Sequence, residues 1–171
     1  MLPYPMPQLS PRATSRSGNS ALELSFVLLP MLALFLAIVD FAVPIFLKSM
    51  FTSAVREGCR FGITYQLTYN GTTYGSQTAA ITAVVQGYSL NFLSGSNASL
   101  INVQYYSPTS PFSQLTGTGA NDPGNILQVS VNSYPWTPIV PLWRSSAPMS
   151  ISAVSADRLE GLAAGASPPT P

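Results

Sequence analysis

An uninterrupted apolar run near the start of the chain limits the possible folds more than any other feature. Residues 24–39 carry no charge, and as a helix these sixteen residues span about 24 Å, short of the ~30 Å hydrocarbon core of a bilayer. Continuing to Leu47 gives twenty-four residues and about 36 Å, enough to span with some tilt. Asp40 would then lie at membrane depth or near the outer interface. We therefore predict a transmembrane helix over about residues 24–47.

A cleaved secretory signal is the alternative explanation of this run. Such a signal needs a cleavage site of small residues directly after its apolar region. Here Asp40, Phe41 and Pro44 follow within five residues of Val39, which is the wrong composition for that site. We therefore expect the helix to stay with the protein.

The residues ahead of the apolar run form a predicted leader peptide, residues 1–18. They include four prolines and two arginines, Arg12 and Arg16, and no acid precedes Glu23. Positive charge before a membrane helix favours a cytoplasmic N-terminus and an exported remainder. Lys48, Arg56 and Arg60 on the far side weaken that preference.

Glu23 stands at the beginning of the apolar run, where a carboxylate costs several kcal/mol unless it has a partner. Glu23 is therefore a candidate functional residue. If the chain were cut after Gly18, Asn19 would become the first residue, and Glu23 would lie about one turn further along the helix. It could then reach the positive N-terminus of a neighbouring chain. The simpler alternative is a first-turn acid, which the helix dipole stabilises by about 0.3–1 kcal/mol.

The order and spacing of several elements resemble the TadE-like pseudopilins, minor pilin-like subunits of tight-adherence pilus systems related to type IV pili. The pattern covers roughly residues 18–62 and consists of Gly18 through Phe26, Pro30, Asp40-Phe41, and Val55 through Phe61. The resemblance implies cleavage by a prepilin peptidase between Gly18 and Asn19. It also implies assembly with other pilin-like subunits and the pilus assembly machinery, with Glu23 as a contact. The implied location is the bacterial cytoplasmic membrane, with the C-terminal domain exported, or a surface pilus.

The remainder of the chain predicts an exported α+β domain over residues 63–160. Apolar residues at spacings of three and four predict that the first helix continues to about Gly62, so that it covers residues 19–62. The later segments predict, in order, a loop over 63–78, a second helix over 79–92 and three strands over 100–106, 126–131 and 149–154. The expected fold class is thus α+β and pilin-like: a long N-terminal transmembrane helix, a second helix and a small antiparallel sheet. Residues 161–171, rich in Pro, Gly and Ala, are expected to be disordered.

Several further side chains in the first helix each allow two interpretations of their role. Asp40 marks the end of the membrane segment, or meets a positive group on a neighbouring subunit or on Lys48. Arg56, Glu57 and Arg60 form a solvated face with a Glu57 to Arg60 contact, or dock a partner helix, and Gly58 permits close helix approach or only lowers helix propensity.

Cys59 and the pair Arg158 and Glu160 also have two interpretations each, and the two tryptophans have a structural one. Cys59 is a small buried hydrophobe, or a thiol whose pKa is lowered by Arg56 and Arg60. Arg158 and Glu160 resemble the Arg-any-Glu at the C-terminal margin of TadE-like domains, or form a solvated pair. Trp136 and Trp143 are expected to anchor the core or the sheet edge.

Composition argues against catalysis and nucleic-acid binding. The chain has no His and only six acids, with no nucleophile–base set, so we expect neither an enzyme nor a metal or cofactor site. A net charge of +1 with no basic run gives no phosphate-binding surface. Besides a processed pseudopilin, the sequence allows an unprocessed single-pass envelope protein whose exported domain binds a ligand.

Overall fold

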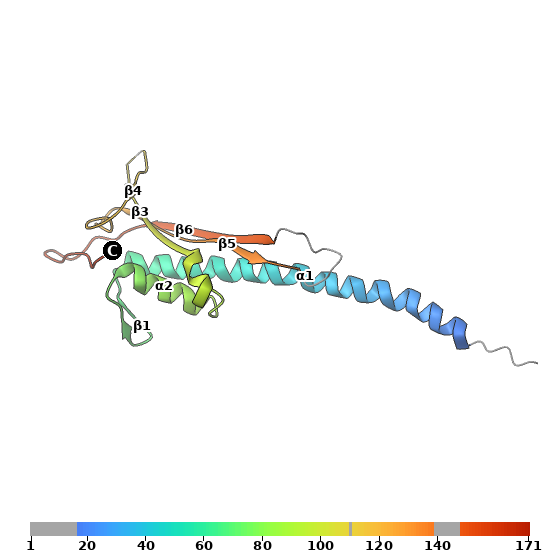
Figure 1. Ribbon diagram of the computed structural model, residues 1–171. Helices are drawn as coiled ribbons and strands as arrows, with labels where there is room; N and C mark the ends of the chain where they lie inside the picture. The colour runs from blue at the N-terminus through green and yellow to red at the C-terminus, as the bar shows by residue number, and fades with distance from the viewer. Residues whose placement is uncertain (1–16, 110, 139–147) are drawn as a thin grey trace, which may run out of the picture.

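The computed structural model describes residues 17–109, 111–138 and 148–171, and shows one long helix with a small α+β domain along its C-terminal half (Figure 1). The elements in chain order are α1 (Ser17–Ile63), β1 (Thr68–Tyr69), β2 (Thr72–Thr73), α2 (Gln77–Tyr88), the 3₁₀ helix η1 (Gly95–Leu100), β3 (Ile101–Tyr106), β4 (Gln114–Leu115), β5 (Ile126–Trp136) and β6 (Met149–Arg158). The predicted α+β class with a long N-terminal helix is confirmed.

α1 is continuous over 47 residues, which corresponds to about 70 Å, and ends one residue beyond the predicted Gly62. Two prolines, Pro30 and Pro44, lie inside it. Each lacks the N–H that would bond the carbonyl four residues earlier, at Phe26 and Asp40 respectively. The helix curves along its length, and its N-terminal part bends away from the axis of the rest (Figure 1).

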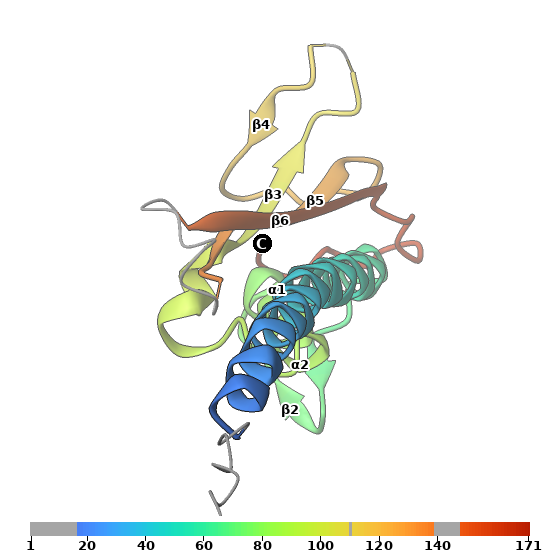
Figure 2. The same ribbon diagram turned by 90° about the vertical axis from the view of Figure 1, so that its right-hand side faces the viewer.

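Four antiparallel strands form the main sheet, in the order β4-β3-β5-β6. The three longer strands are the three predicted ones, but β5 and β6 extend beyond their predicted ends. Pairing between β5 and β6 shifts register between Val131 and Tyr134, and this bulge lets β5 run on to Trp136. One face of the sheet lies on α1 (Figure 2).

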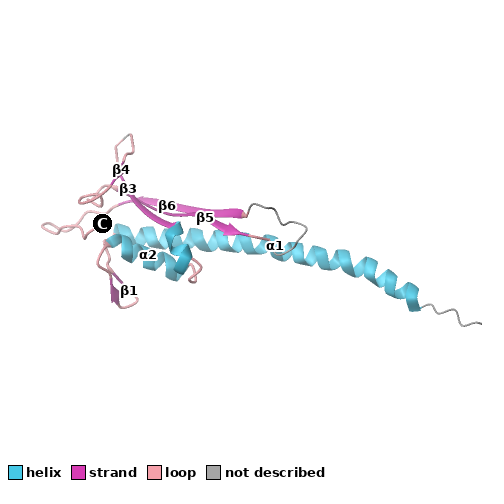
Figure 3. Ribbon diagram, viewed as in Figure 1, coloured by secondary structure: helices cyan, strands magenta, loops and turns pink. Residues whose placement is uncertain are grey.

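Two short pairings were missed in the sequence. β4 adds two residues to the edge of β3. β1 and β2 form a hairpin inside the predicted 63–78 loop, with Asn70 and Gly71 at positive φ in the turn (Figure 3). Asn70-Gly71 was the turn signal in the sequence, but strands of two residues have no periodicity to reveal them.

The second helix is shorter than the predicted 79–92. Ser76 caps its N-terminus by accepting a hydrogen bond from the Ala79 N–H at 3.2 Å. It ends at Tyr88, because the next residues leave helical geometry: Leu90 and Asn91 have φ of 51° and 63°. The predicted end at residue 92 is therefore wrong by about one turn.

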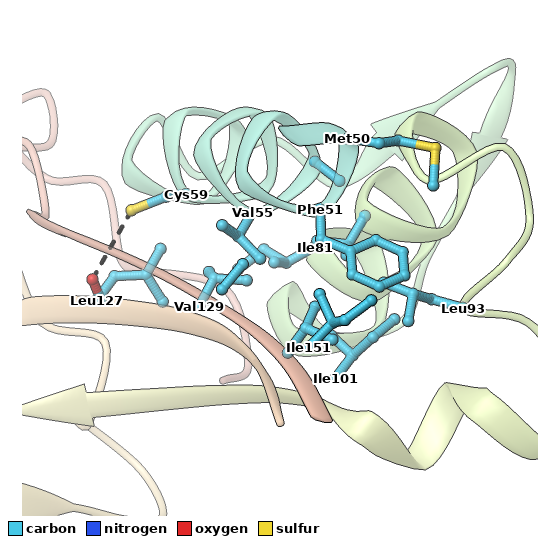
Figure 4. Packing of buried hydrophobic residues seen from close by; sticks show 14 of the residues in the cluster. Met50, Phe51, Val55, Cys59, Ile81, Leu93, Ile101, Leu127, Val129 and Ile151 are labelled. Carbon is cyan, nitrogen blue, oxygen red and sulfur yellow. Dashed lines mark hydrogen bonds between the residues drawn. The ribbon is translucent and has the colours of Figure 1, made fainter. Parts of the chain in front are cut away.

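The core lies between α1, α2 and the sheet (Figure 4). α1 contributes a stripe at spacings of three and four residues: Leu47, Met50, Phe51, Ala54, Val55, Gly58, Cys59 and Gly62. Leu127, Val129 and Val131 of β5 face it, all fully buried. Much of the stripe predicted for the outer part of the helix is therefore packed against the domain, with Phe61 at its half-buried edge.

The expectation of a disordered tail is wrong for the last residues. The tail returns to the domain, where the Thr170 carbonyl accepts a hydrogen bond from the Gln77 N–H at 2.8 Å. The Pro169 carbonyl accepts another from Asn121 Nδ2 at 2.7 Å. Gln77 stands at the first turn of α2, where backbone N–H groups lack helical partners, so the tail supplies an acceptor that the helix needs.

Candidate membrane-anchoring and assembly surface

The N-terminal half of α1 is exposed on every side. From Ser20 to Val39 no described side chain is buried, and most of them are large and apolar. The most exposed are Phe26, Leu29, Met31, Val27, Leu34, Leu24 and Phe35. At 1.5 Å per residue this segment is about 30 Å long, which matches the hydrocarbon core of a bilayer. We call residues 20–39 the exposed apolar segment.

Within the described residues, one helix, Ser20–Ile63, is long and apolar enough to cross a membrane. Only 6% of its most apolar window is buried, so the segment is not the core helix of a soluble domain. It is also continuous with the helical stripe from Leu47 to Gly62 that forms part of the core. A signal-peptidase cut after the apolar segment would therefore fall inside an unbroken helix.

Glu23 lies near the start of the exposed apolar segment and is itself exposed. α1 is already helical at Gly18 and Asn19, so Asn19 and Glu23 are separated by one helical turn and share a face. A shallow groove beside Glu23 exposes little but apolar surface. It is lined by Leu22, Ser25, Phe26, Leu29 and Pro30. The Glu23 carboxylate thus lies beside exposed apolar surface at the start of the segment.

Asp40 differs from Glu23, because its side chain is buried, with 7% exposed. It is the first buried position along the described part of α1, and it continues the spacing of the core stripe through Val43 and Leu47. Asp40 lines a cavity of about 180 Å³ with Phe41, Pro138 and Met149, where β5 has ended and β6 begins. The domain thus covers one face of the helix from Asp40 onward.

Lys48, the predicted partner within the chain, is used elsewhere. Its Nζ donates a hydrogen bond to the Ser152 carbonyl of β6. This bond ties α1 to the outermost strand of the sheet, two turns beyond Asp40. The polar groups of this region thus fix the sheet to the helix at the outer end of the exposed apolar segment.

The predicted docking residues separate into one buried and three outer positions. Gly58 lies against α2, where a Cβ atom would lie 2.5 Å from Val85 Cγ2. Arg56 and Arg60 are exposed, and Arg60 Nη1 lies 3.8 Å from Glu57 Oε1 in the expected i,i+3 contact. An exposed pair of this kind adds only a few tenths of a kcal/mol, about 0.2–0.5.

Cys59 is buried, and its Sγ lies 3.8 Å from the Leu127 carbonyl (Figure 4). Burial raises the pKa of its thiol from 9.0 to about 11; a hydrogen bond with Ser155 opposes this shift, and the charge of Asp157 adds to it. The alternative in which Arg56 and Arg60 lower the pKa is therefore wrong, because both arginines point to solvent while the thiol points to the core. Cys59 behaves as a small core residue.

The chain end beyond β6 closes the far end of α1. The Glu160 N–H donates to the Ile63 carbonyl at 3.2 Å, and Arg158 Nε donates to the Gly124 carbonyl at 2.9 Å. Arg158 and Glu160 thus bond backbone carbonyls of neighbouring segments. Trp136 packs against the core as expected, and Trp143 lies outside the described residues.

Gln77 was not among the predicted site residues, yet it is fully buried and joins four parts of the domain. Its Nε2 donates to the Gly62 carbonyl at 2.6 Å, and its Oε1 accepts from Asn121 Nδ2 at 2.5 Å and from the Tyr105 hydroxyl at 3.4 Å. A glutamine directly after a capping serine was the only signal, and it does not reveal such distant partners. No group of three or more metal-ligating side chains occurs within the described ranges.

Comparison with known proteins gives a match over the greater part of α1. Residues 18–60 match the family model described as TadE-like protein, which confirms the resemblance over that segment. No curated protein and no solved structure matches the chain. The matched segment begins at Gly18, includes the whole exposed apolar segment and ends within the packed half of α1. Family and helix together are consistent with a membrane location.

Proposed function

We propose that this chain is a minor pilin-like structural subunit, a pseudopilin, that takes part in assembly of a tight-adherence pilus. Its role is structural and not catalytic. The observation that carries the proposal is the exposed apolar segment with Glu23 near its start, in the same helix whose other half packs against the α+β domain. The TadE-like match to residues 18–60 supports the same pilus-associated role.

Maturation is the first step of the proposed function. A prepilin peptidase removes residues 1–18, so that Asn19 carries the new α-amino group. The exposed apolar segment then holds the subunit in the cytoplasmic membrane. The exported domain begins to cover the helix at Asp40, directly after this segment. Arg12 and Arg16 of the leader favour the cytoplasmic side before the cut.

Assembly exchanges lipid contacts for helix contacts. Because lipid tails are as apolar as leucine, burial alone gives little preference for helix association in a bilayer, and polar pairing supplies direction. Glu23 provides such a pair with the α-amino group of a neighbouring subunit's Asn19. The carboxylate gains most where water is excluded, so the pair favours the assembled state over the isolated membrane helix.

Intact mass measurement of the membrane-extracted protein tests the maturation step. We expect a mature chain beginning at Asn19. A chain that begins at Met1 and is exported normally would contradict the proposal and favour an unprocessed, membrane-anchored envelope protein.

Substitution of Glu23 tests the assembly step. Glu23→Val should leave processing intact and abolish co-purification with partner pilin-like subunits. Glu57→Val is the matched control, since Glu57 lies on the solvated side of the packed half and should retain assembly. Equal assembly by both variants would refute the pairing role of Glu23.

A further inference from the structure

The face of the sheet that points away from α1 has a distinct chemistry. Leu127, Val129 and Val131 of β5 point into the core, so the alternating residues Gln128 and Ser130 point to the opposite face, where Gln128 is half-buried and Ser130 is only 6% exposed. The strand register sets Gln104 opposite Gln128, and Asn102 opposite Ser130. None of the described helices covers this face (Figure 2).

Two hollows on this face meet at Gln128. One, of about 420 Å³, is lined chiefly by Gln104, Gln128, Ser130, Asn132 and Ser152. The other, of about 350 Å³, is lined by Tyr106, Phe112, Ile126 and Gln128. Together they form a shallow groove across β3, β5 and the start of β6, which we call the amide groove.

The amide groove combines neutral hydrogen-bonding groups with aromatic surface. Each Asn or Gln amide offers donors and an acceptor, and each Ser hydroxyl offers both, so the array matches ligands whose hydroxyl groups also donate and accept. Phe112 is 62% exposed beside Tyr106, and gives an apolar ring at one end. Among the described residues that line the two hollows, the one charged side chain is Lys48, and its ammonium already bonds the Ser152 carbonyl.

This composition selects between ligand classes. An acidic polymer or a phosphate needs arginine or lysine, and a basic peptide needs carboxylates; the groove presents neither beyond Lys48. A neutral sugar chain presents many hydroxyl groups and apolar C–H faces, which complement amides and aromatic rings. We propose that the amide groove binds a neutral oligosaccharide, with Gln128 at the centre and Tyr106 and Phe112 packing against a sugar face.

The sheet makes the groove suitable for such a weak ligand. Gln128 is on a central strand paired on both sides, and the Tyr106 hydroxyl donates to Gln104 Oε1 at 3.1 Å. Groups held by a paired sheet lose little conformational freedom on binding. Repetition of the groove on several chains would raise the avidity of a weak single site.

The test uses the full chain in detergent on an array of immobilised neutral oligosaccharides built from glucose, galactose or N-acetylglucosamine, with sialylated and uronic-acid chains as the acidic arm. We expect binding to at least one neutral series and background signal on the acidic arm. Gln128→Leu should lower the binding at least tenfold, and Phe112→Ser, at a 62% exposed position outside the core, should lower it severalfold. Gln66→Leu, the matched change on an exposed loop outside the groove, should change it less than twofold.

Three results would overturn the proposal. These are background signal on every neutral series, equal signal on the acidic arm, or unchanged binding by both groove variants. Sedimentation velocity adds a separate outcome: self-association that disappears in Gln128→Leu would assign the face to a second copy of the chain. None of these results depends on cleavage after Gly18, so the pilus proposal stands or fails independently.

Discussion

The two halves of α1 differ in composition and have opposite surroundings. Residues 20–39 expose large side chains such as Phe26 and Leu29 on every side, whereas the half from Leu47 to Gly62 buries one stripe. The packed half places small residues, Ala54, Gly58 and Gly62, where α2 and the sheet approach. The exposed apolar segment carries one charged residue, Glu23, whereas the packed half carries four on the sides away from its stripe, so charge as well as residue size distinguishes the halves.

The first prediction sets one phenylalanine from each half against the other. Phe51 is fully buried, and its ring lies 5.0 Å from that of Tyr134 in an edge contact. Phe51→Ala should lower the free energy of unfolding of the domain by about 3–5 kcal/mol, because it leaves a cavity. Phe35→Ala, at a 62% exposed position, should change it by less than about 0.5 kcal/mol. Urea unfolding in detergent, followed by tryptophan fluorescence, measures both.

Equal losses in the two phenylalanine variants would contradict the comparison. That result would mean that the exposed apolar segment also packs on the domain in solution.

A second, smaller effect is expected where the packed half meets α2. Gly58→Ala places a methyl group 2.5 Å from Val85 Cγ2, which should cost about 1–3 kcal/mol even though alanine improves helix propensity by about 1 kcal/mol. Adding Val85→Ala should relieve the clash, so that the two changes are not additive in a double-mutant cycle. Additive losses would show that Gly58 is required for some reason other than close approach.

Local pattern predicted much of this fold. The spacing in α1 predicted both its length and its packed stripe, and the alternation in 100–106 and 126–131 predicted two strands within one residue of their starts. The end of β5 was not predictable in the same way. Asn132, Ser133 and Pro135 interrupt alternation, and only pairing with β6 across a bulge carries the strand through them.

The different surroundings of Glu23 and Asp40 could not be read from the sequence. Both are single acids in one apolar helix, and the pattern gives each the same need for a partner. Asp40 is buried because Pro138 and Met149, about a hundred residues away, return to the helix. Contacts at that separation depend on the whole sheet, whereas the described residues that line the groove beside Glu23 all belong to α1.

The C-terminal tail offers a third test of how the packed half is closed. Deletion of residues 168–171 removes the acceptor of the Gln77 N–H and one of the two acceptors of Asn121 Nδ2, and should lower the free energy of unfolding by about 1–3 kcal/mol because the buried Gln77 N–H loses its partner. Hydrogen exchange should become faster at the Gln77 amide and stay unchanged in residues 20–39. Deletion of Pro171 alone keeps both carbonyls and is the control. Unchanged exchange at Gln77 would refute the capping role of the tail.

The smallest expected effect concerns Cys59, the thiol that is buried in the packed half of α1. Its folded pKa of about 11 lies above the ordinary 9.0, so above pH 9 the unfolded chain loses a proton that the folded chain retains. Cys59 therefore contributes stability that is complete below pH 9 and is lost as pH rises toward 11. Burial also raises the pKa values of Tyr65 and Tyr105, which act in the same direction at higher pH. Melting temperatures between pH 7 and 10.5 should fall above pH 9, and fall less steeply in Cys59→Ala.

The control for the Cys59 prediction is Ala54→Ser, a change on the same stripe without a titrating group. It should shift the curve of melting temperature against pH without altering its slope. Equal slopes for the wild type and Cys59→Ala would show that the thiol ionises as readily in the folded chain as in the unfolded one.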